Sequence, residues 1–195
     1  MPVLLSEEEV IRRNMGLAQE QIYTVEDVES MPEGEMAELI DGRLYYMAAP
    51  TARHQEIVTF LCWKIQSFLK NSKCPCRVYA SPFAVFLNDD SYNYFMPDIS
   101  VICGKDKMGR DGCHGAPDLI MEIVSKSSQS LDYMTKLFKY RAAGVKEYWI
   151  IDPLKKVILV YDFIGNQAGQ FAFTDCIRVN IFEDFMLDFA ELDEE

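Results

Sequence analysis

The chain has 195 residues, of which 49% are hydrophobic and 12% aromatic, so it is long enough to bury one sizeable core. Its formal net charge of −12 argues against a broad basic surface and avid, indiscriminate binding to nucleic acid, but leaves room for a local basic groove. No apolar run approaches the ~20 residues that span a bilayer, and the N-terminus turns acidic before a signal-peptide core forms. We expect a cytoplasmic protein with one globular domain over residues 22–195, preceded by a helical extension over residues 1–21.

The six cysteines stand at irregular spacings, unlike the dense disulfide framework of a small secreted scaffold. We expect free, mostly buried thiols. Cys74 and Cys76, together with Cys113 and His114, suggest a zinc site, although neither pair has the usual ligand spacing. A zinc-held scaffold is therefore a weak alternative.

Three patterns in the first part of the chain predict local structure. Ser6 and Thr24 each stand three residues ahead of an acid, which is the capping-box signature of a helix start. Asp41 and Gly42 lie between two apolar-rich arms and predict a β-hairpin, because glycine accepts the positive φ of a tight turn. Over residues 54–71, apolar positions recur at three and four, as on a helix packed against a sheet.

Strand patterns and one more helix follow. Strands are expected within residues 77–87, 95–103, 117–125, 145–152, 156–163 and 170–175. A helix is expected over residues 130–143, with Gly144 as its C-terminal stop and with Asp132, Lys136 and Lys139 on its polar side. The residues predicted for its apolar face are Leu131, Met134, Leu137, Phe138 and Arg141 or Ala142. This order favours the α/β or α+β class, with a mixed sheet flanked by helices.

Glu122 stands in the middle of an apolar strand pattern. Since alternate strand residues share a face, it points the same way as Asp118, Ile120 and Val124, and opposite to Leu119, Met121 and Ile123. Burying an unpaired carboxylate costs several kcal/mol, so Glu122 needs a hydrogen-bond donor, a cation or a metal.

Asp98 begins the preceding strand pattern and would lie beside Glu122 if the two strands pair. Two neighbouring carboxylates suit Mg²⁺ or Mn²⁺, and Lys136 is placed to reach the same point. Two acids, a divalent cation and a lysine are what phosphodiester hydrolysis requires. The alternative from spacing alone is structural: Glu122 pairs with Lys136 or an arginine, and Asp98 caps a turn.

Several segments resemble the Uma-two family, restriction-endonuclease-like proteins of the PD-(D/E)XK nuclease superfamily. They are "AELIDGRLYYMAAPTARH", "PDISVI", "APDLIMEIVSKSS", the D-x-x-x-K of Asp132 to Lys136, "YRAAGVKEYWIIDP" and "FMLDFAEL". The resemblance implies a restriction-endonuclease-like core with Asp98 and Glu122 as metal ligands. The superfamily's Glu-x-Lys is not intact, because Val124 stands two residues after Glu122, so the resemblance makes Lys136 the matching lysine.

The resemblance adds two weaker candidates, Glu38 and His54. For His54, a helix-start histidine bonded to the backbone is an equal alternative. Asp118 lies about 13 Å along the strand from Glu122 and is expected to cap the strand or hold the glycine-rich loop before it. Lys126 is expected to be solvated, with phosphate contact as the alternative.

The sequence thus predicts a Mg²⁺- or Mn²⁺-dependent endonuclease that acts on DNA through Asp98, Glu122 and Lys136. A homodimer fits an enzyme that must reach two strands. The alternative of a different class is a nuclease-like interaction module without turnover, which the acidic charge favours.

Overall fold

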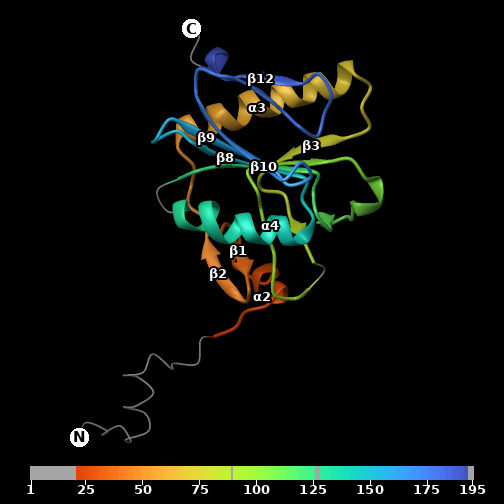
Figure 1. Cartoon of the computed structure of the whole chain (residues 1–195). Helices are drawn as coiled ribbons and strands as arrows, with labels where there is room; N and C mark the ends of the chain where they lie inside the picture. Colours follow the sequence, from red (N-terminus) through yellow and green to blue (C-terminus); the bar gives the residue numbers. More distant parts are fainter. Residues whose placement is uncertain (1–20, 89, 126–127, 193–195) are drawn as a thin grey trace, which may run out of the picture.

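The computed structural model describes residues 21–88, 90–125 and 128–192. A six-stranded sheet forms the middle layer, with α3 (Ala52–Asn71) on one face and α4 (Leu137–Ala143) on the other (Figure 1). In spatial order its strands are β10 (Gln167–Ala172), β9 (Val157–Asp162), β8 (Glu147–Asp152), β7 (Leu119–Ile123), β5 (Ile99–Ile102) and β3 (Arg77–Ala80). The pairs are antiparallel except for β7 with β8, which are parallel. The predicted mixed sheet between helices is therefore confirmed.

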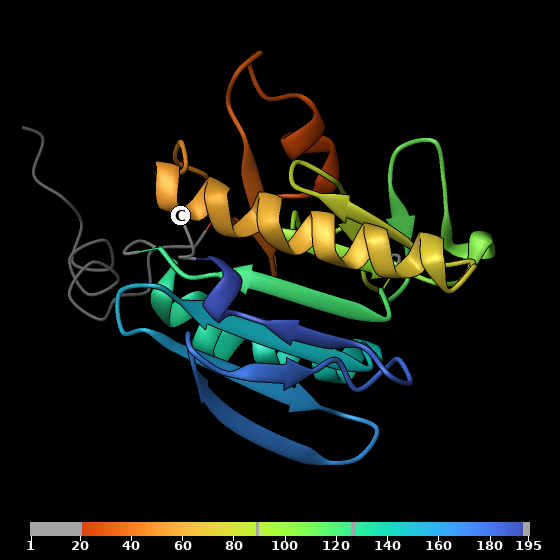
Figure 2. The same cartoon turned by 90° about the horizontal axis from the view of Figure 1, so that it is seen from above.

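Small two-stranded sheets complete the described fold. Their strands are β1 (Ala37–Ile40) with β2 (Arg43–Tyr46), β4 (Val85–Phe86) with β6 (Cys113–His114), and β11 (Cys176–Arg178) with β12 (Met186–Asp188). Figure 2 shows β11 and β12 beside α3, over the same face of the large sheet. The C-terminal segment thus completes the layer that α3 begins.

The predicted hairpin is β1 and β2, joined by Asp41 and Gly42 with φ of 51° and 75°. Two positive φ values suit the right-handed twist of the strands that the turn connects. The backbones of Leu39 and Tyr94 exchange hydrogen bonds of 2.7 and 2.8 Å, and Lys139 of α4 pairs with Asp41. These contacts fix the hairpin against the α4 side of the molecule (Figure 1).

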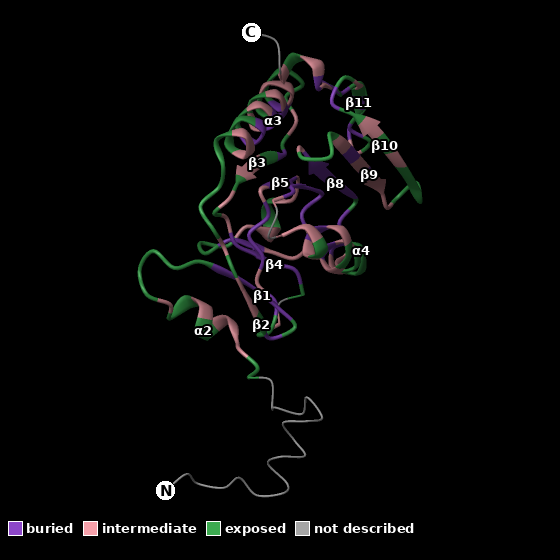
Figure 3. Ribbon diagram, turned by 90° about the vertical axis from the view of Figure 1, so that its left-hand side faces the viewer, coloured by how far each residue is buried: buried purple, intermediate pink, exposed green. Residues whose placement is uncertain are grey.

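The two faces of β7 alternate as the sequence predicts. Leu119, Met121 and Ile123 belong to the apolar cluster on the α3 side, whereas Ile120 and Val124 belong to the cluster on the α4 side. Figure 3 shows the central strands as the most buried part of the fold. The expected core role of "GVKEYWIID" is also confirmed, because the aromatic side chains of β8 are fully buried.

The predicted apolar face of the helix over residues 130–143 is only partly correct, because Leu131 and Leu137 pack against the apolar cluster on the α4 side but Met134 and Phe138 do not. Met134 and Phe138 are 62% and 67% exposed, whereas Asp132, Lys136 and Tyr140 are buried. The helix begins as a π-helix, η2 (Leu131–Lys136), and continues as α4. Ion pairs of the buried polar face, described below, decide its orientation in place of the apolar pattern.

Other differences concern element boundaries. The strand expected over residues 77–87 is divided: β3 ends at Ala80, the cis Ser81–Pro82 peptide follows, and β4 pairs in another sheet. Proline lacks the amide that a continuing strand needs. β10 begins at Gln167 instead of residue 170, and β11 with β12 are additional.

Two short N-terminal helices were expected. The one at Thr24 is α2 (Val25–Glu29), where the Thr24 amide donates to Asp27 in a capping box. The one at Ser6 and the extension that holds it lie outside the described residues, as does Lys126. No helix in the described part of the chain is both long and apolar enough to cross a membrane.

A matched pair of truncations tests the orientation of the second helix. Phe138→Ala should change the free energy of unfolding by less than about 0.5 kcal/mol, because the ring is exposed. Leu61→Ala, on the fully buried face of α3, should cost about 2–5 kcal/mol. Urea unfolding followed by circular dichroism measures both, and a similar loss in the two variants would contradict the observed orientation.

Candidate active site

Asp98 and Glu122 lie side by side because β5 pairs antiparallel with β7, in the register Ile99 to Met121. The Asp98 amide donates to Glu122 Oε2 at 3.4 Å, and the Ile123 amide donates to Asp98 Oδ2 at 2.8 Å. The pairing on which the sequence prediction depended is therefore present. Each carboxylate is oriented by the backbone of the other's strand.

Lys136 places its ammonium among three carboxylates. Its Nζ lies 2.8 Å from Glu38 Oε2, 2.9 Å from Glu122 Oε1 and 3.5 Å from Asp132 Oδ1. All four side chains are almost completely buried. The structure thus brings the hairpin glutamate to the same cation as the strand glutamate.

The helical segment after Ser130 supplies two further buried groups. Asp132 and Tyr140 lie one turn before and one turn after Lys136, so the three side chains share one face. The Tyr140 hydroxyl donates to Glu122 Oε1 at 2.7 Å, and the Tyr148 hydroxyl donates to the Asp132 carbonyl at 3.0 Å. Single π-helical turns occur often at functional sites.

Glu38 and His54, the two accessory candidates, both reach the site. Glu38 Oε1 accepts from the Met96 amide at 2.9 Å, which ties β1 to the segment that leads into Asp98. His54 Nε2 lies 3.2 Å from Asp98 Oδ2. The amide of His54 donates to Thr51 Oγ1, which caps the start of α3, while the ring contacts the Asp98 carboxylate.

Asp98 favours the charged form of His54. Burial alone would lower the pKa of His54, but the hydrogen bond and the negative charge of Asp98 outweigh burial, so the pKa is raised. His54 Nδ1 is buried and has no hydrogen-bond partner in the described part of the chain. The imidazole thus links α3 to the carboxylate pair.

The cluster has more carboxylates than Lys136 can neutralise. Burial alone would lower the pKa of Lys136, but Glu122, Glu38 and Asp132 outweigh it and raise that pKa well above its usual value, so the lysine is charged. Burial raises the pKa of Glu122 well above normal and that of Asp132 to about 6, and Lys136 only partly offsets both shifts. The site therefore favours an added cation or an added proton.

The donor atoms fit a hard divalent cation of the Mg²⁺ type. Asp98 Oδ1 accepts no hydrogen bond from a described residue, and the bond that Glu122 Oε2 accepts is long, so each carboxylate keeps an oxygen for a ligand. Within the described residues, no three His, Cys, Asp or Glu side chains are arranged to hold a metal. Mg²⁺ is commonly bound by one or two carboxylates together with water and substrate phosphate, so the pair fits that mode.

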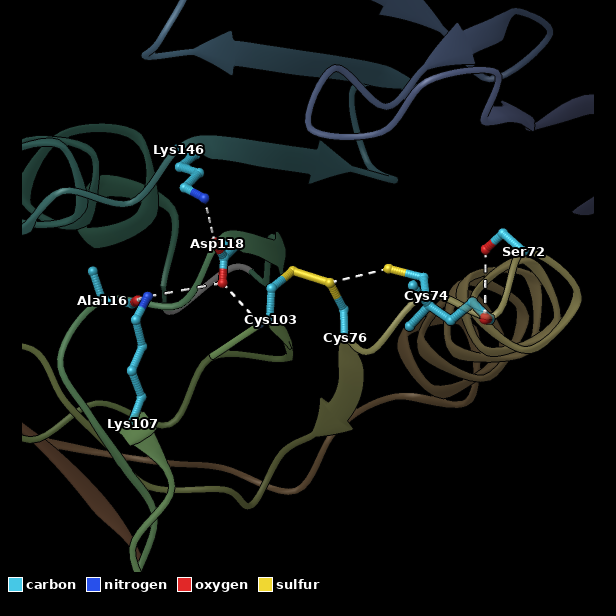
Figure 4. The surroundings of a disulfide bond; sticks show 9 residues. Ser72, Cys74, Cys76, Cys103, Lys107, Ala116, Asp118 and Lys146 are labelled. Carbon is cyan, nitrogen blue, oxygen red and sulfur yellow. Dashed lines mark hydrogen bonds and ion pairs between the residues drawn. A yellow bond between two sulfur atoms is a disulfide. The ribbon is translucent and has the colours of Figure 1, made fainter. Parts of the chain in front are cut away.

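Asp118 lies outside the site, as expected from its distance along β7. It accepts from the Cys103 amide at 2.8 Å and pairs with Lys146 at 2.7 Å and with Lys107 at 3.8 Å (Figure 4). Lys107 belongs to the glycine-rich loop and also donates to the Ala116 carbonyl. Asp118 therefore holds the glycine-rich loop against the N-terminal end of β7.

The cysteine expectations are only partly correct. Cys76 and Cys103 form a disulfide, so not all six cysteines are free thiols. Cys113 belongs to the apolar cluster on the opposite face of the sheet from Cys76, and His114 pairs with Asp111. The four residues of the zinc alternative are thus not assembled into one site.

The sequence prediction did not assign Asp132 and Tyr140 to the site. Their four-residue spacings from Lys136 were the available signal, because such a spacing places side chains on one helix face. The apolar residues at the intervening positions suggested that the opposite face of the helix is the buried one, and this hid the signal of the spacing. Tyr140 nevertheless donates directly to Glu122.

A mixed sheet with an aspartate and a glutamate on paired central strands and a buried lysine from the next helix defines the restriction-endonuclease-like class. Within that class the chain belongs to the Uma2 family, described as putative restriction endonucleases, whose family model matches residues 24–187.

A solved structure supports the fold. The chain is similar to a crystal structure of a putative nuclease belonging to DUF820 from Anabaena variabilis ATCC 29413, with a TM-score of 0.71 and 20% sequence identity. The match covers 87% of this chain and 96% of the other. No curated protein matches the chain significantly.

The raised pKa of Asp132 gives a test of the crowded charges. Asp132 has an ordinary pKa of 3.8 and a folded value of about 6, so the folded state holds the extra proton between these values and its stability falls as the pH rises through them. The amide introduced by Asp132→Asn would not titrate. In metal-free buffer, wild type should therefore lose roughly 1–3 kcal/mol more than Asp132→Asn between about pH 4.5 and about pH 7.5.

Urea unfolding at the two pH values, with a chelator present, measures this difference. Comparing each protein with itself removes the constant cost of the substitution. Asp111→Asn is the control. The Asp111 carboxyl is exposed, and its hydrogen bond with His114 lowers its pKa. Equal losses in wild type and Asp132→Asn would show that Asp132 is not held protonated in the folded state.

Proposed function

We propose that the protein is a metal-dependent endonuclease that hydrolyses DNA phosphodiester bonds with Asp98, Glu122 and Lys136. The observation that carries the proposal is the pair of carboxylates of Asp98, directly before β5, and Glu122 in β7, with the Lys136 ammonium 2.9 Å from Glu122. Membership of the Uma2 family supports the same reaction class. A cytoplasmic homodimer would bring two such sites to the two strands of a duplex.

Asp98 and Glu122 would hold Mg²⁺ or Mn²⁺ through the oxygens that the protein leaves for a ligand. The ion, when bound, supplies polarisation of the phosphate and a lower pKa for the attacking water. The Ile123 amide and His54 fix the direction of the Asp98 carboxylate. Tyr140 and Lys136 do the same for Glu122, and both favour its ionised form by hydrogen bonding.

Lys136 would stabilise negative charge on the phosphate. An ammonium has three donors, and here they face Glu38, Glu122 and Asp132. The Asp132 contact, at 3.5 Å, is the longest of the three and is the one that a phosphate oxygen would replace. Protonation of Asp132, whose pKa is raised to about 6, would release that donor.

A second candidate is a nuclease-like module that binds without cutting. Two observations favour it: the net charge of −12, which opposes a polyanion, and the depth of Lys136, whose side chain is 5% exposed. The two functions share the fold and the carboxylate pair, and they differ in turnover.

Metal binding tests the carboxylate pair. Asp98→Asn and Glu122→Gln should each weaken Mn²⁺ binding by more than about tenfold, because each removes a charged ligand while preserving shape. Isothermal titration calorimetry measures the affinity, and circular dichroism checks the fold. Asp118→Asn is the matched control, since it changes a buried carboxylate of the same sheet outside the site. Unchanged Mn²⁺ titrations in both site variants would remove the proposed metal site.

Cleavage tests turnover. With Mn²⁺, the wild-type protein should cut at least one of single-stranded, double-stranded and branched DNA. Lys136→Gln should slow that cleavage by roughly 10²–10³-fold, as the loss of one preorganised charge-stabilising donor does elsewhere. Intact metal binding with no cleavage of any substrate would support the binding module instead.

A further inference from the structure

The hairpin of β1 and β2 presents one of its faces to the helical segment that carries Lys136. Alternate residues of a strand share a face, and so do residues that lie directly opposite in an antiparallel pair. Glu38 lies opposite Tyr45, and Ile40 lies opposite Arg43. Since the Glu38 carboxylate contacts the Lys136 ammonium at 2.8 Å, the hairpin face that reaches the carboxylate cluster also carries Tyr45 and Arg43.

A pocket of about 550 Å³ lies between this hairpin face and the helical segment. Ile40, Arg43 and Tyr45 line it from the hairpin, and Thr135, the residue before Lys136, lines it from η2. Ile40 belongs to the apolar cluster on the α4 side of the large sheet, and Tyr45 packs against that cluster. Figure 1 shows the hairpin on the same side of the sheet. The pocket therefore adjoins the candidate active site.

The pocket combines an aromatic ring with apolar and charged groups. Tyr45 is half-buried, whereas Ile22 and Arg43 of the lining are exposed, so the pocket is open to solvent. Among the described residues of the lining, Asp41 is the one acid, and Lys139 pairs with it. Arg43 adds a positive charge. An aromatic face with a neighbouring guanidinium suits a flat aromatic ligand that is attached to a phosphate.

We propose that this pocket takes one unpaired nucleobase of the DNA strand whose phosphate reaches Asp98, Glu122 and Lys136, with the base stacked on the Tyr45 ring. The inference rests on the proposed nuclease function and adds its substrate class, which is DNA with an unpaired nucleotide at the site. Every base has a π-face, so stacking tolerates any sequence. A base within a duplex must first leave its stack and its pairing partner, which costs free energy, so a single strand binds better.

Stacking also fits the charge of the chain. Neutralisation of phosphates by lysine and arginine supplies most non-specific affinity for nucleic acid, and a net charge of −12 limits that contribution. Stacking of one base on one aromatic side chain strengthens binding by roughly 5–150-fold without a basic surface. An acidic protein thus gains more from a base pocket beside its site than from contacts to the phosphates alone.

Binding without turnover tests the pocket. Fluorescence anisotropy measures the affinity of the full chain for a labelled thymidine oligonucleotide of about twelve nucleotides, at low salt and with a chelator present so that no strand is cut. The single strand should bind more tightly than its duplex. Tyr45→Leu should weaken the single-stranded complex by roughly 5–150-fold, because it keeps apolar bulk and removes the π-face. Tyr45→Phe should keep the affinity, because stacking needs the ring and not the hydroxyl.

Tyr46→Leu is the matched control and should not change the affinity. Tyr46 is the next residue of the same strand, so its side chain lies on the other face of the hairpin, and it is 66% exposed. Circular dichroism checks that each variant is folded. Photocrosslinking tests the contact in the unaltered protein: an oligonucleotide with iododeoxyuridine in place of thymidine should crosslink to Tyr45, which peptide mass spectrometry identifies.

Absence of binding to the single strand, equal affinity for single strand and duplex, unchanged affinity in Tyr45→Leu, or crosslinks that avoid Tyr45 would overturn the proposal. These outcomes are separate from those that test turnover. Binding that depends on Tyr45, without cleavage in Mn²⁺, would support the pocket and count against the nuclease. Cleavage in Mn²⁺, with binding that does not depend on Tyr45, would support the nuclease and remove the pocket.

Discussion

The buried ammonium of Lys136 is the interaction on which the arrangement of the described fold depends. Removing a charge from water costs several kcal/mol, and here three carboxylates from three separate segments compensate that cost. Glu38 brings the hairpin, Glu122 the sheet and Asp132 the helical segment. Loss of the lysine would leave these acids facing one another, so the same contact that orients the site also joins its supporting elements.

This interaction also explains which parts of the prediction succeeded. Strand alternation and pairing were enough to place Glu122 beside Asp98, because a two-residue period leaves little freedom. Part of the helix face was assigned wrongly because Met134 and Phe138 extend a convincing apolar pattern, whereas the energy of the buried ion pairs depends on partners distant in sequence. Glu38 and His54 came from family resemblance, since nothing in their local sequence indicates Lys136 or Asp98 as a partner. The Cys76–Cys103 disulfide depends on strand register, which irregular cysteine spacing does not reveal.

The contacts that stabilise Glu122 in the fold are the same ones that orient it in the candidate site. Its ion pair with Lys136 and its hydrogen bond from Tyr140 are what any buried carboxylate requires, and they also hold it in one orientation beside Asp98. The surplus of acids over bases makes the cluster electrostatically incomplete. A site of this kind binds an additional positive charge more readily than a balanced ion pair does.

The residues of the cluster all come from the chain between Glu38 and Tyr140. The C-terminal segment with β11 and β12 instead completes the layer around α3, where Phe185 stacks on Phe68 with ring centroids 4.2 Å apart. The turn between β9 and β10 contains Ile164, which is 70% exposed. A fluorophore or an affinity tag attached at Ile164 would therefore report on or immobilise the protein without entering its chemistry.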